Sequence, residues 1–406
     1  MQSSRRTVWR YYAYLATTAY GFYLPVGLLY LQSEFGWAVV GLTQGVFAFA
    51  LLLAEIPTGY LGDRIGRRAS LAVGNALSAG ALGIFVFLDS PLEYVLLYAV
   101  WAVGWAFRSG TEQAWLYELL QSRGDDDEYA RVSGRGSTVV LLVSAVTAAA
   151  AGLLVTYGWE VPLLANAALS ALGIPVVLSL PAVSPDGDAP ADADVFRVRD
   201  ALHTLRLQVG RPEVRWVVAY VALFHVLFAV TRPYESPIAE QVGVPVAALG
   251  LLFAGFKLVS AGAASTAGWF REHLGTRRVF VLLIPVYGLA YASVALLPVL
   301  VLPVFFLNRS VQKVVRPLRD QYLNDRLTDV GRATVLSGAS MVLSLASGTA
   351  NLVSGSLVEL LGPFRFLAAA GVLLAGLGGL LWLAVSPVRT SEGTSATPTA
   401  TTADAD

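Results

Sequence analysis

Residues 59–68 read Gly59-Tyr60-Leu61-Gly62-Asp63-Arg64-Ile65-Gly66-Arg67-Arg68 and join two long apolar runs. Residues 268–277 read Gly268-Trp269-Phe270-Arg271-Glu272-His273-Leu274-Gly275-Thr276-Arg277 and repeat the outer glycines, the aromatic residue, the acid and the last arginine in register. Gly41-Leu42 and Gly250-Leu251 pair at the same offset. Such self-similarity indicates an internal repeat. The sequence therefore predicts two equivalent halves.

The composition is typical of a membrane protein. Of 406 residues, 56% are hydrophobic and 14% are charged, whereas about a quarter of the residues of a soluble protein are charged. A run of roughly 20 apolar residues can cross a bilayer as a helix, because a helix satisfies its own backbone hydrogen bonds. Such runs lie at residues 8–31, 37–60, 69–88, 92–112, 135–157, 160–181, 213–232, 246–269, 279–297, 299–318, 333–360 and 364–385. We expect an all-α membrane protein with about twelve transmembrane helices in two pseudo-symmetric six-helix bundles.

The arginines of the loops fall mainly on one side of the expected membrane. They are Arg5, Arg6, Arg64, Arg67, Arg68, Arg123, Arg131, Arg211, Arg215, Arg271, Arg277, Arg278, Arg319, Arg326 and Arg332. Short cytoplasmic loops keep the excess of positive charge. We therefore expect a multi-pass protein of the cell (plasma) membrane with both termini in the cytoplasm.

The connecting segments divide the chain into four parts. Residues 1–182 are expected to form the N-terminal six-helix bundle, and residues 212–385 the C-terminal one. Residues 183–211 read as a cytoplasmic linker whose second half has the apolar spacing of an amphipathic interfacial helix. The Thr-rich and acidic tail, residues 386–406, is expected to be disordered.

The sequence lacks the motifs and composition that are typical of several functional classes. The net charge is zero and cysteine is absent, so the sequence offers neither a basic nucleic-acid surface nor a thiolate site. It contains no Gly-x-x-x-x-Gly-Lys-Ser/Thr phosphate loop and no His-Glu-x-x-His metal motif. We expect no enzyme activity, cofactor, metal or nucleic-acid partner, and a monomer that binds a small molecule.

The stretch at residues 59–68 resembles the loop between the second and third spans of the major facilitator superfamily, Gly-x-Leu-x-Asp-Arg-x-Gly-Arg-Arg. The resemblance implies a latch that closes the cytoplasmic side in the outward-open state and loosens when the two halves rock. Its residues are Gly59, Gly62, Asp63, Arg64, Gly66, Arg67 and Arg68, with Gly268, Glu272 and Gly275 in the second copy. A role of the arginines in fixing topology is compatible with it.

Polar residues inside the spans are candidates for a substrate site, because placing them in hydrocarbon is costly. In this family, helices one, four, seven and ten surround a central cavity. The candidates are Tyr20, Tyr23, Arg108, His225, Lys257, Asn308, Arg309, Gln312 and Lys313. Arg309 and Lys313 are four residues apart and share a helix face, which predicts a cationic wall for an anionic substrate. Neutralisation by nearby carboxylates, or snorkelling, is the alternative.

Three residues are candidates for carrying a coupling proton: Glu55, Glu112 and His225. Each has a structural alternative. Glu112 is four residues from Arg108 and so placed to form an ion pair with it, Glu55 is close enough to join the latch, and a lone histidine often only packs.

Together these features predict a secondary transporter that moves a small solute by alternating access. A proton is a candidate coupling ion, and an organic anion is favoured as substrate. Multidrug or antibiotic efflux is the rival function, although residues 148–152, Ala-Ala-Ala-Ala-Gly, lack the Gly-Pro motif of efflux members. A non-transporting membrane sensor on the same fold is the alternative of another class.

Overall fold

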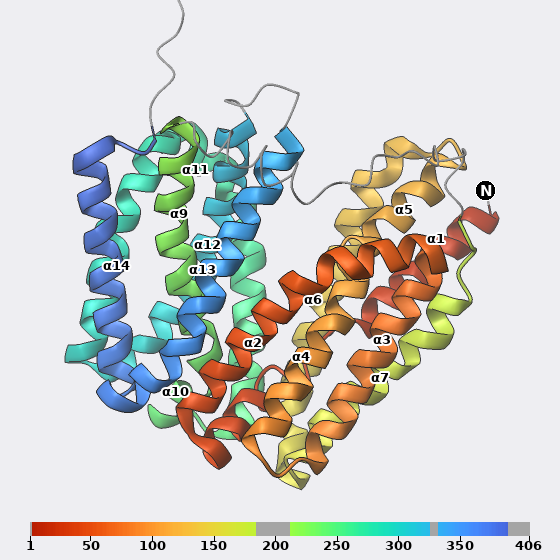
Figure 1. The fold of residues 1–406 in the computed structure, drawn as a ribbon, viewed down its shortest axis with the longest axis horizontal. Helices are drawn as coiled ribbons and strands as arrows, with labels where there is room; N and C mark the ends of the chain where they lie inside the picture. The colour runs from red at the N-terminus through yellow and green to blue at the C-terminus, as the bar shows by residue number, and fades with distance from the viewer. Residues whose placement is uncertain (1, 184–211, 325–331, 389–406) are drawn as a thin grey trace, which may run out of the picture.

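The computed structural model describes residues 2–183, 212–324 and 332–388, and every regular element in these ranges is helical. Figure 1 shows two helical bundles, one built from α1 to α7 and the other from α9 to α14. The predicted all-α membrane fold is thereby confirmed. The expected linker helix and tail lie outside the described residues, apart from residues 183 and 386–388.

The first bundle contains seven helices and three short 3-10 turns. They are α1 (Gln2–Thr17), α2 (Gly27–Ile65), α3 (Arg67–Ile84), η1 (Phe85–Phe87), α4 (Pro91–Arg108), α5 (Thr111–Gln121), η2 (Asp126–Glu128), α6 (Tyr129–Leu154), η3 (Val155–Tyr157) and α7 (Glu160–Leu178). The second bundle contains α9 (Pro212–Thr231), η4 (Arg232–Tyr234), α10 (Glu235–Gln241), α11 (Val246–Leu296), η5 (Pro298–Leu300), α12 (Val301–Asn324), α13 (Arg332–Leu361) and α14 (Pro363–Val385).

Two of these helices contain a sharp break and cover more than one expected span. Gly36 in α2 has φ 83° and Gly275 in α11 has φ 73°, a conformation that glycine adopts without steric penalty. Nine helices of the described part are long and apolar enough to cross a membrane, α2 and α11 among them. The arrangement is consistent with about twelve spans.

The first and fourth expected spans differ from the sequence prediction. Turns at residues 18–26 separate α1 from α2, so the first expected span, residues 8–31, is interrupted. The fourth helix was expected to reach residue 112 but ends at Arg108, because Gly110 has φ 75° and starts the separate helix α5. The seventh expected span ends in the short turn η4, between α9 and α10.

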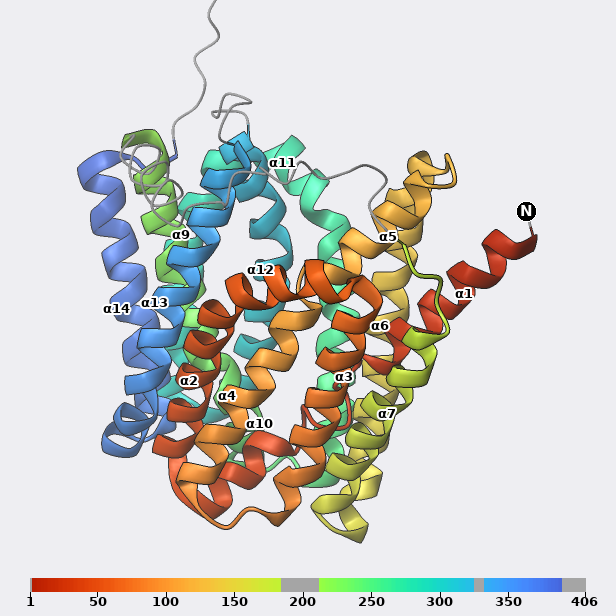
Figure 2. The same ribbon diagram turned by 45° about the vertical axis from the view of Figure 1, so that its right-hand side comes forward.

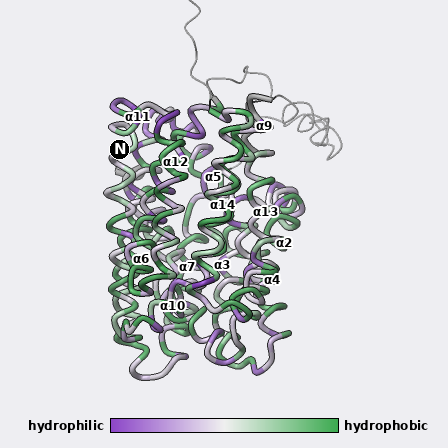
Figure 3. Tube along the Cα trace, turned by 90° about the vertical axis from the view of Figure 1, so that its left-hand side faces the viewer, coloured by the Kyte–Doolittle hydropathy of each residue, from purple (hydrophilic) through white to green (hydrophobic). Residues whose placement is uncertain are grey.

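The outer surface of both bundles is apolar. Leu153, Leu289, Leu360 and Leu383 are each at least 70% exposed, and Figure 3 shows hydrophobic residues along the helices with many hydrophilic ones at their upper ends. Water disfavours such a surface, whereas a bilayer provides a matching solvent.

The two bundles meet at one end and diverge at the other (Figure 1). We call the end where they meet, which includes the break at Gly36, the Gly36 end. The other, which includes the turn between α2 and α3, is the Gly66 end. The short helix α10 lies at the Gly36 end (Figure 2). There α2 packs on α13 and α6 packs on α11.

Glycines allow this close approach. A Cβ on Gly41 would lie 2.6 Å from the backbone nitrogen of Gly355, and a Cβ on Gly250 would lie 2.1 Å from the carbonyl oxygen of Ala148. Small residues at helix crossings permit such backbone contacts within a membrane. Gly41 and Gly250 are equivalent positions of the internal repeat, so the repeat extends to the contact between the halves.

Gly250→Leu should force α11 away from α6. We expect a lower melting temperature, since overpacking costs about 1–3 kcal/mol, and a wider separation at the Gly36 end. The chain has no cysteine, so spin labels on Tyr157→Cys and Leu296→Cys, both highly exposed, report that separation by electron-electron resonance.

The matched control is Gly262→Leu on the same helix, where a Cβ meets no atom within 4 Å. An unchanged distance distribution for Gly250→Leu would contradict the role of this crossing in holding the halves together.

Candidate functional site

A charged cluster forms where the seventh expected span breaks. Pro233 has no N–H to donate and so cannot extend the helical ladder of α9, and the chain passes through η4 to Glu235 at the start of α10. The Glu235 side chain is fully buried. Arg309 on α12 donates from Nε to its Oε1 at 3.1 Å and from Nη2 to its Oε2. This bidentate geometry is the strong form of an arginine–carboxylate pair.

Three further cations lie near this pair. Lys257 on α11 interacts electrostatically with Arg309, Arg232, Lys313 and Glu235. Arg232 interacts with Arg309, with Glu235 and with Tyr23 of the first bundle. Lys313 and Arg232 are exposed, whereas Arg309 is 14% exposed. We call Arg232, Lys257, Arg309, Lys313 and Glu235 the charge cluster; in the described part of the chain it holds four cations and one carboxylate.

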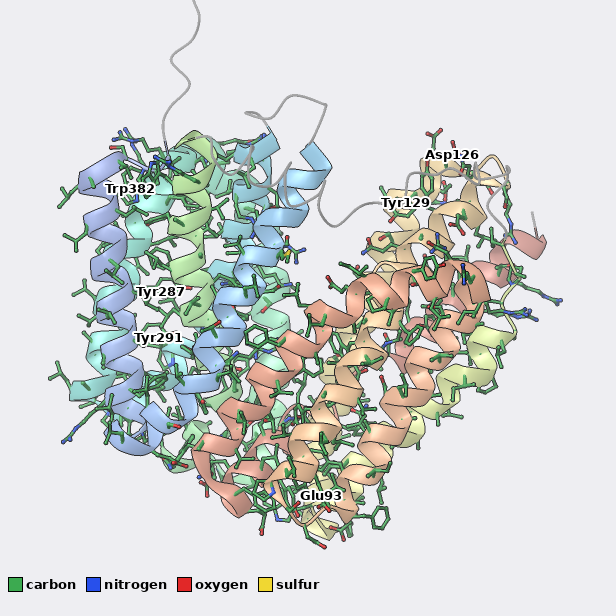
Figure 4. The ribbon with its side chains drawn as sticks, in the orientation of Figure 1. Glu93, Asp126, Tyr129, Tyr287, Tyr291 and Trp382 are labelled. Atoms are coloured by element: carbon green, nitrogen blue, oxygen red, sulfur yellow. The ribbon has the colours of Figure 1, made fainter. Side chains whose placement is uncertain are left out.

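The two uncharged candidates on α12, Asn308 and Gln312, lie in different surroundings from the cations. Asn308 is buried, and its Oδ1 accepts a hydrogen bond from Tyr287 at 3.0 Å. Tyr287 and Tyr291 stack on each other inside the second bundle (Figure 4). Gln312 is half-buried. The structure thus brings the two cations of α12 to the cluster and directs Asn308 into the bundle.

In the first bundle, Arg108 lies among aromatic rings. Its Nη2 donates to the hydroxyl of Tyr20 and its Nη1 donates to Oδ1 of Asn75 at 3.3 Å. The guanidinium carbon lies 5.3 Å from the ring centre of Tyr20 and 5.5 Å from that of Trp105, within the range of cation–π attraction. Tyr23 hydrogen-bonds to Tyr98 through the two hydroxyls. Arg108 therefore has neutral partners.

The ion pair considered for Arg108 and Glu112 is not formed. The break at Gly110 separates them, so the four-residue spacing does not place them on one continuous helix face. Glu112 instead accepts a hydrogen bond from the hydroxyl of Tyr11 at 3.2 Å.

The other two proton-carrying candidates lie apart from Glu112. Glu55 is exposed, and its side chain makes no hydrogen bond or ion pair within the described ranges. His225 on α9 interacts electrostatically with Arg319 and Arg316. The three candidates therefore do not form one group.

The repeated motif makes its contacts inside its own bundle. Arg67 pairs with Asp63 at 2.5 Å and with Glu118 of α5 at 3.1 Å, and the Asp63 side chain is 63% exposed. Arg68 donates to the carbonyl oxygen of Leu180 at 3.0 Å. Arg64 lies over the ring of Tyr60.

The glycines of the motif have two different environments. Gly66 and Gly275 both adopt a positive φ, and Gly62 approaches Ser70 on α3. A Cβ on Gly59 or Gly268 would meet no atom within 4 Å. Glu272 lies on the exposed surface of α11. The backbone conformation therefore requires glycine at Gly66 and Gly275, whereas Gly59 and Gly268 have space for a side chain.

Sequence reasoning missed Arg232, Glu235 and Glu118. Arg232 is the last residue of the predicted seventh span, residues 213–232, and Glu235 lies three residues beyond it. The signal that could have found them is Pro233, because a helix break inside a membrane exposes polar backbone and often lies next to a binding site. Glu118 could not be found from spacing, since it reaches the motif from a different helix.

Comparisons with known proteins agree with this architecture. The family model of the Major Facilitator Superfamily matches residues 12–233 and 221–403. The chain is similar to the uncharacterised MFS-type transporter YxaM of Bacillus subtilis (strain 168), with 22% identity over 242 residues, or 58% of this chain and 59% of that protein. The match thus spans less than two thirds of this relative's length.

Two solved structures share the fold. One is a mutant of the nucleoside transporter NupG, with a TM-score of 0.78, 15% identity, and coverage of 93% of this chain and 98% of that chain. The other is a D-xylose-proton symporter, with a TM-score of 0.67, 13% identity, and coverage of 92% of this chain and 96% of that chain.

Removing the carboxylate should destabilise the protein more than removing its partner. Glu235→Gln leaves the four cations of the cluster without their carboxylate, and breaking a buried pair in this way costs about 3–5 kcal/mol. Arg309→Met leaves Arg232 and Lys257 to interact with Glu235, so we expect a smaller loss. Thermal unfolding of the purified protein measures both. A larger loss of stability for Arg309→Met than for Glu235→Gln would contradict the excess of cations in the cluster.

Proposed function

The chain belongs to the Major Facilitator Superfamily of membrane transporters, and we propose that it is a secondary transporter that carries a small organic anion by alternating access, as a monomer. The observation that carries this proposal is the composition of the charge cluster. Among the residues that the structure describes, the cluster holds four cations and one carboxylate, Glu235. Arg309 pairs with Glu235, Arg232 and Lys257 interact with it electrostatically, and Lys313 interacts with Lys257.

Electrostatics favours an anion at this place. Two like charges about 8 Å apart repel by about 2 kcal/mol at an effective dielectric constant of 20, and charges removed from water need partners. Arg232 and Lys313 are exposed and therefore accessible to a solute. A carboxylate, phosphate or sulfonate group would balance part of the excess charge, and the guanidinium fork of Arg232 suits each of them.

The arrangement of the bundles supports alternating access. They meet at the Gly36 end and diverge at the Gly66 end (Figure 1). The excess of arginine in the loops at the Gly66 end assigns that end to the cytoplasm of the cell membrane, which makes the arrangement inward-facing with cytoplasmic termini. The exposed Asp63 is consistent with a released latch.

Glu235 is our candidate for coupling to a proton. Both of its oxygens accept hydrogen bonds from Arg309, so an anion that competes for Arg309 would release the carboxylate. A released carboxylate is then free to exchange a proton as the solute binds and leaves. Glu112, which accepts a hydrogen bond from Tyr11, the exposed Glu55, and His225, which lies near Arg316 and Arg319, are second candidates.

The other functions have less support. A site with four cations repels the lipophilic cations that multidrug efflux proteins often carry, which disfavours efflux. A non-transporting sensor would share the fold but would show no flux. Uptake of a labelled organic anion into proteoliposomes distinguishes a transporter from a sensor.

Lys313→Gln should weaken anion binding about tenfold, which corresponds to about 1.4 kcal/mol and is typical of a lost hydrogen bond to a charged group. The rise in melting temperature of the purified protein with increasing anion concentration measures the affinity for the anion. Arg365→Gln is the matched control, because Arg365 is an exposed cation near the start of α14. Equal affinities in the two variants would remove the support for the anion site.

Asp63→Asn should leave insertion and anion affinity intact but lower the rate of turnover. Loss of the charge removes the contact with Arg67 and the latch that the family resemblance implies. Initial uptake rates in proteoliposomes measure turnover, and Asp127→Asn at the exposed turn η2 is the control. An unchanged rate would leave Asp63 with a role in topology alone.

A further inference from the structure

Aromatic side chains form a wall in the first bundle. The rings of Tyr20 and Trp105 stack at 5.3 Å with an angle of 24° between their planes. Phe47 contacts Trp105 edge-on at 5.9 Å and Trp101 at 6.1 Å. Tyr20 and Trp101 are buried, whereas Trp105 is 36% exposed. Trp105 therefore offers a large accessible aromatic surface in this wall.

The exposure of Trp105 is not explained by lipid. Leu96 of the same helix is 58% exposed and lines an apolar groove on the surface between α3 and α4. Nine residues, or about two and a half turns, separate Leu96 from Trp105, which places them on opposite faces of α4. Trp105 shares its face with Arg108, one turn further on, and a charged residue marks a face turned away from hydrocarbon.

The aromatic wall and the charge cluster lie at similar depths. Both α4 and α12 start at the Gly36 end, where Figure 4 shows Glu93 of the first turn of α4. With a rise of about 1.5 Å per residue, Trp105 lies about 21 Å along α4, and Lys313 lies about 18 Å along α12. Tyr23, whose ring contacts Trp101 of the wall edge-on at 4.8 Å, interacts electrostatically with Arg232 of the charge cluster.

Arg108 adds to the attraction for an electron-rich ring. Its guanidinium lies 5.5 Å from the ring centre of Trp105 and has no carboxylate partner within hydrogen-bond distance in the described part of the chain. An aromatic ring laid on Trp105 would gain stacking contacts that a saturated ring of the same size cannot make.

We propose that the transported anion carries a planar aromatic ring, which stacks on Trp105 while Arg232 and Lys313 hold its anionic group. The proposal rests on the proposed function and narrows its substrate class. It assigns the two halves different roles, with recognition of the ring in the first and recognition of the charge in the second.

The test compares three probes with the purified full chain: naphthalene-2-carboxylate, the saturated decahydronaphthalene-2-carboxylate, and naphthalene-2-methanol. Dissociation constants come from calorimetry. We expect naphthalene-2-carboxylate to bind roughly 3- to 10-fold more tightly than its saturated analogue, the fold-change that corresponds to the contribution of an aromatic pair. The alcohol should bind more weakly than either carboxylate.

Substitutions test whether Trp105 causes the preference for the aromatic carboxylate. Trp105→Leu should remove the preference for the aromatic carboxylate, and Trp105→Phe should keep most of it, which shows that the site still folds. Lys313→Gln should weaken both carboxylates alike. Trp269→Leu is the control, because Trp269 is 53% exposed but lies on α11 and stacks on His273.

The outcomes separate the two proposals. If both carboxylates bind equally, or if Trp105→Leu leaves their ratio unchanged, the aromatic substrate class is overturned and the anion transporter stands. If neither carboxylate binds, or if the alcohol binds as tightly as the aromatic carboxylate, the anion site itself is overturned and the aromatic proposal fails with it.

Discussion

The buried ion pair between Glu235 and Arg309 is the interaction on which much of the second bundle depends. A carboxylate with no exposure is tolerated in this environment only when its charge is paired and its oxygens accept hydrogen bonds. Both conditions are met by one arginine, which ties the break between α9 and α10 to α12. The residue just before it, Tyr234, hydrogen-bonds to Ser354 on α13 and contacts Trp37 of the first bundle. The same short segment therefore carries the charge cluster and part of the contact between the halves.

That contact depends on the absence of side chains. Where α2 crosses α13 and α6 crosses α11, a single added Cβ on Gly41 or Gly250 would overlap backbone atoms of the opposite bundle. Backbones packed this closely are either in contact or apart, without a stable intermediate separation. A transporter needs such a two-state contact at each end of its path. Gly41 and Gly250 are equivalent positions of the repeat, so the two crossings between the halves are similar.

The sequence predicted the helices better than the site. Apolar runs predicted most spans to within a few residues, and the repeated motif marked the breaks between helices that contain Gly66 and Gly275, because the backbone and the solvent decide these features. The contact partners of side chains are harder to predict, because sequence spacing shows which residues share a helix face but not which residue of another helix contacts that face. Glu235 was missed because the break at Pro233 moves it out of the apolar run and into the protein. The Arg108–Glu112 pair fails for a related reason, because a glycine between the two residues ends the helix on which the spacing argument relied.

The two halves share a fold but differ in chemistry. Arg108 in the first half is satisfied by the neutral groups of Tyr20 and Asn75, whereas Arg309 in the second is satisfied by a carboxylate. Under the proposed function, an entering anion competes with no carboxylate hydrogen-bonded to Arg108 among the described residues, whereas at Arg309 it competes with Glu235. Neutral partners are exchanged at little electrostatic cost, while displacement of a buried carboxylate requires that its charge be removed or paired again. Under the proposed function, this difference places binding of the solute within reach of both halves and makes Glu235, in the second half, the first candidate for coupling that binding to a proton.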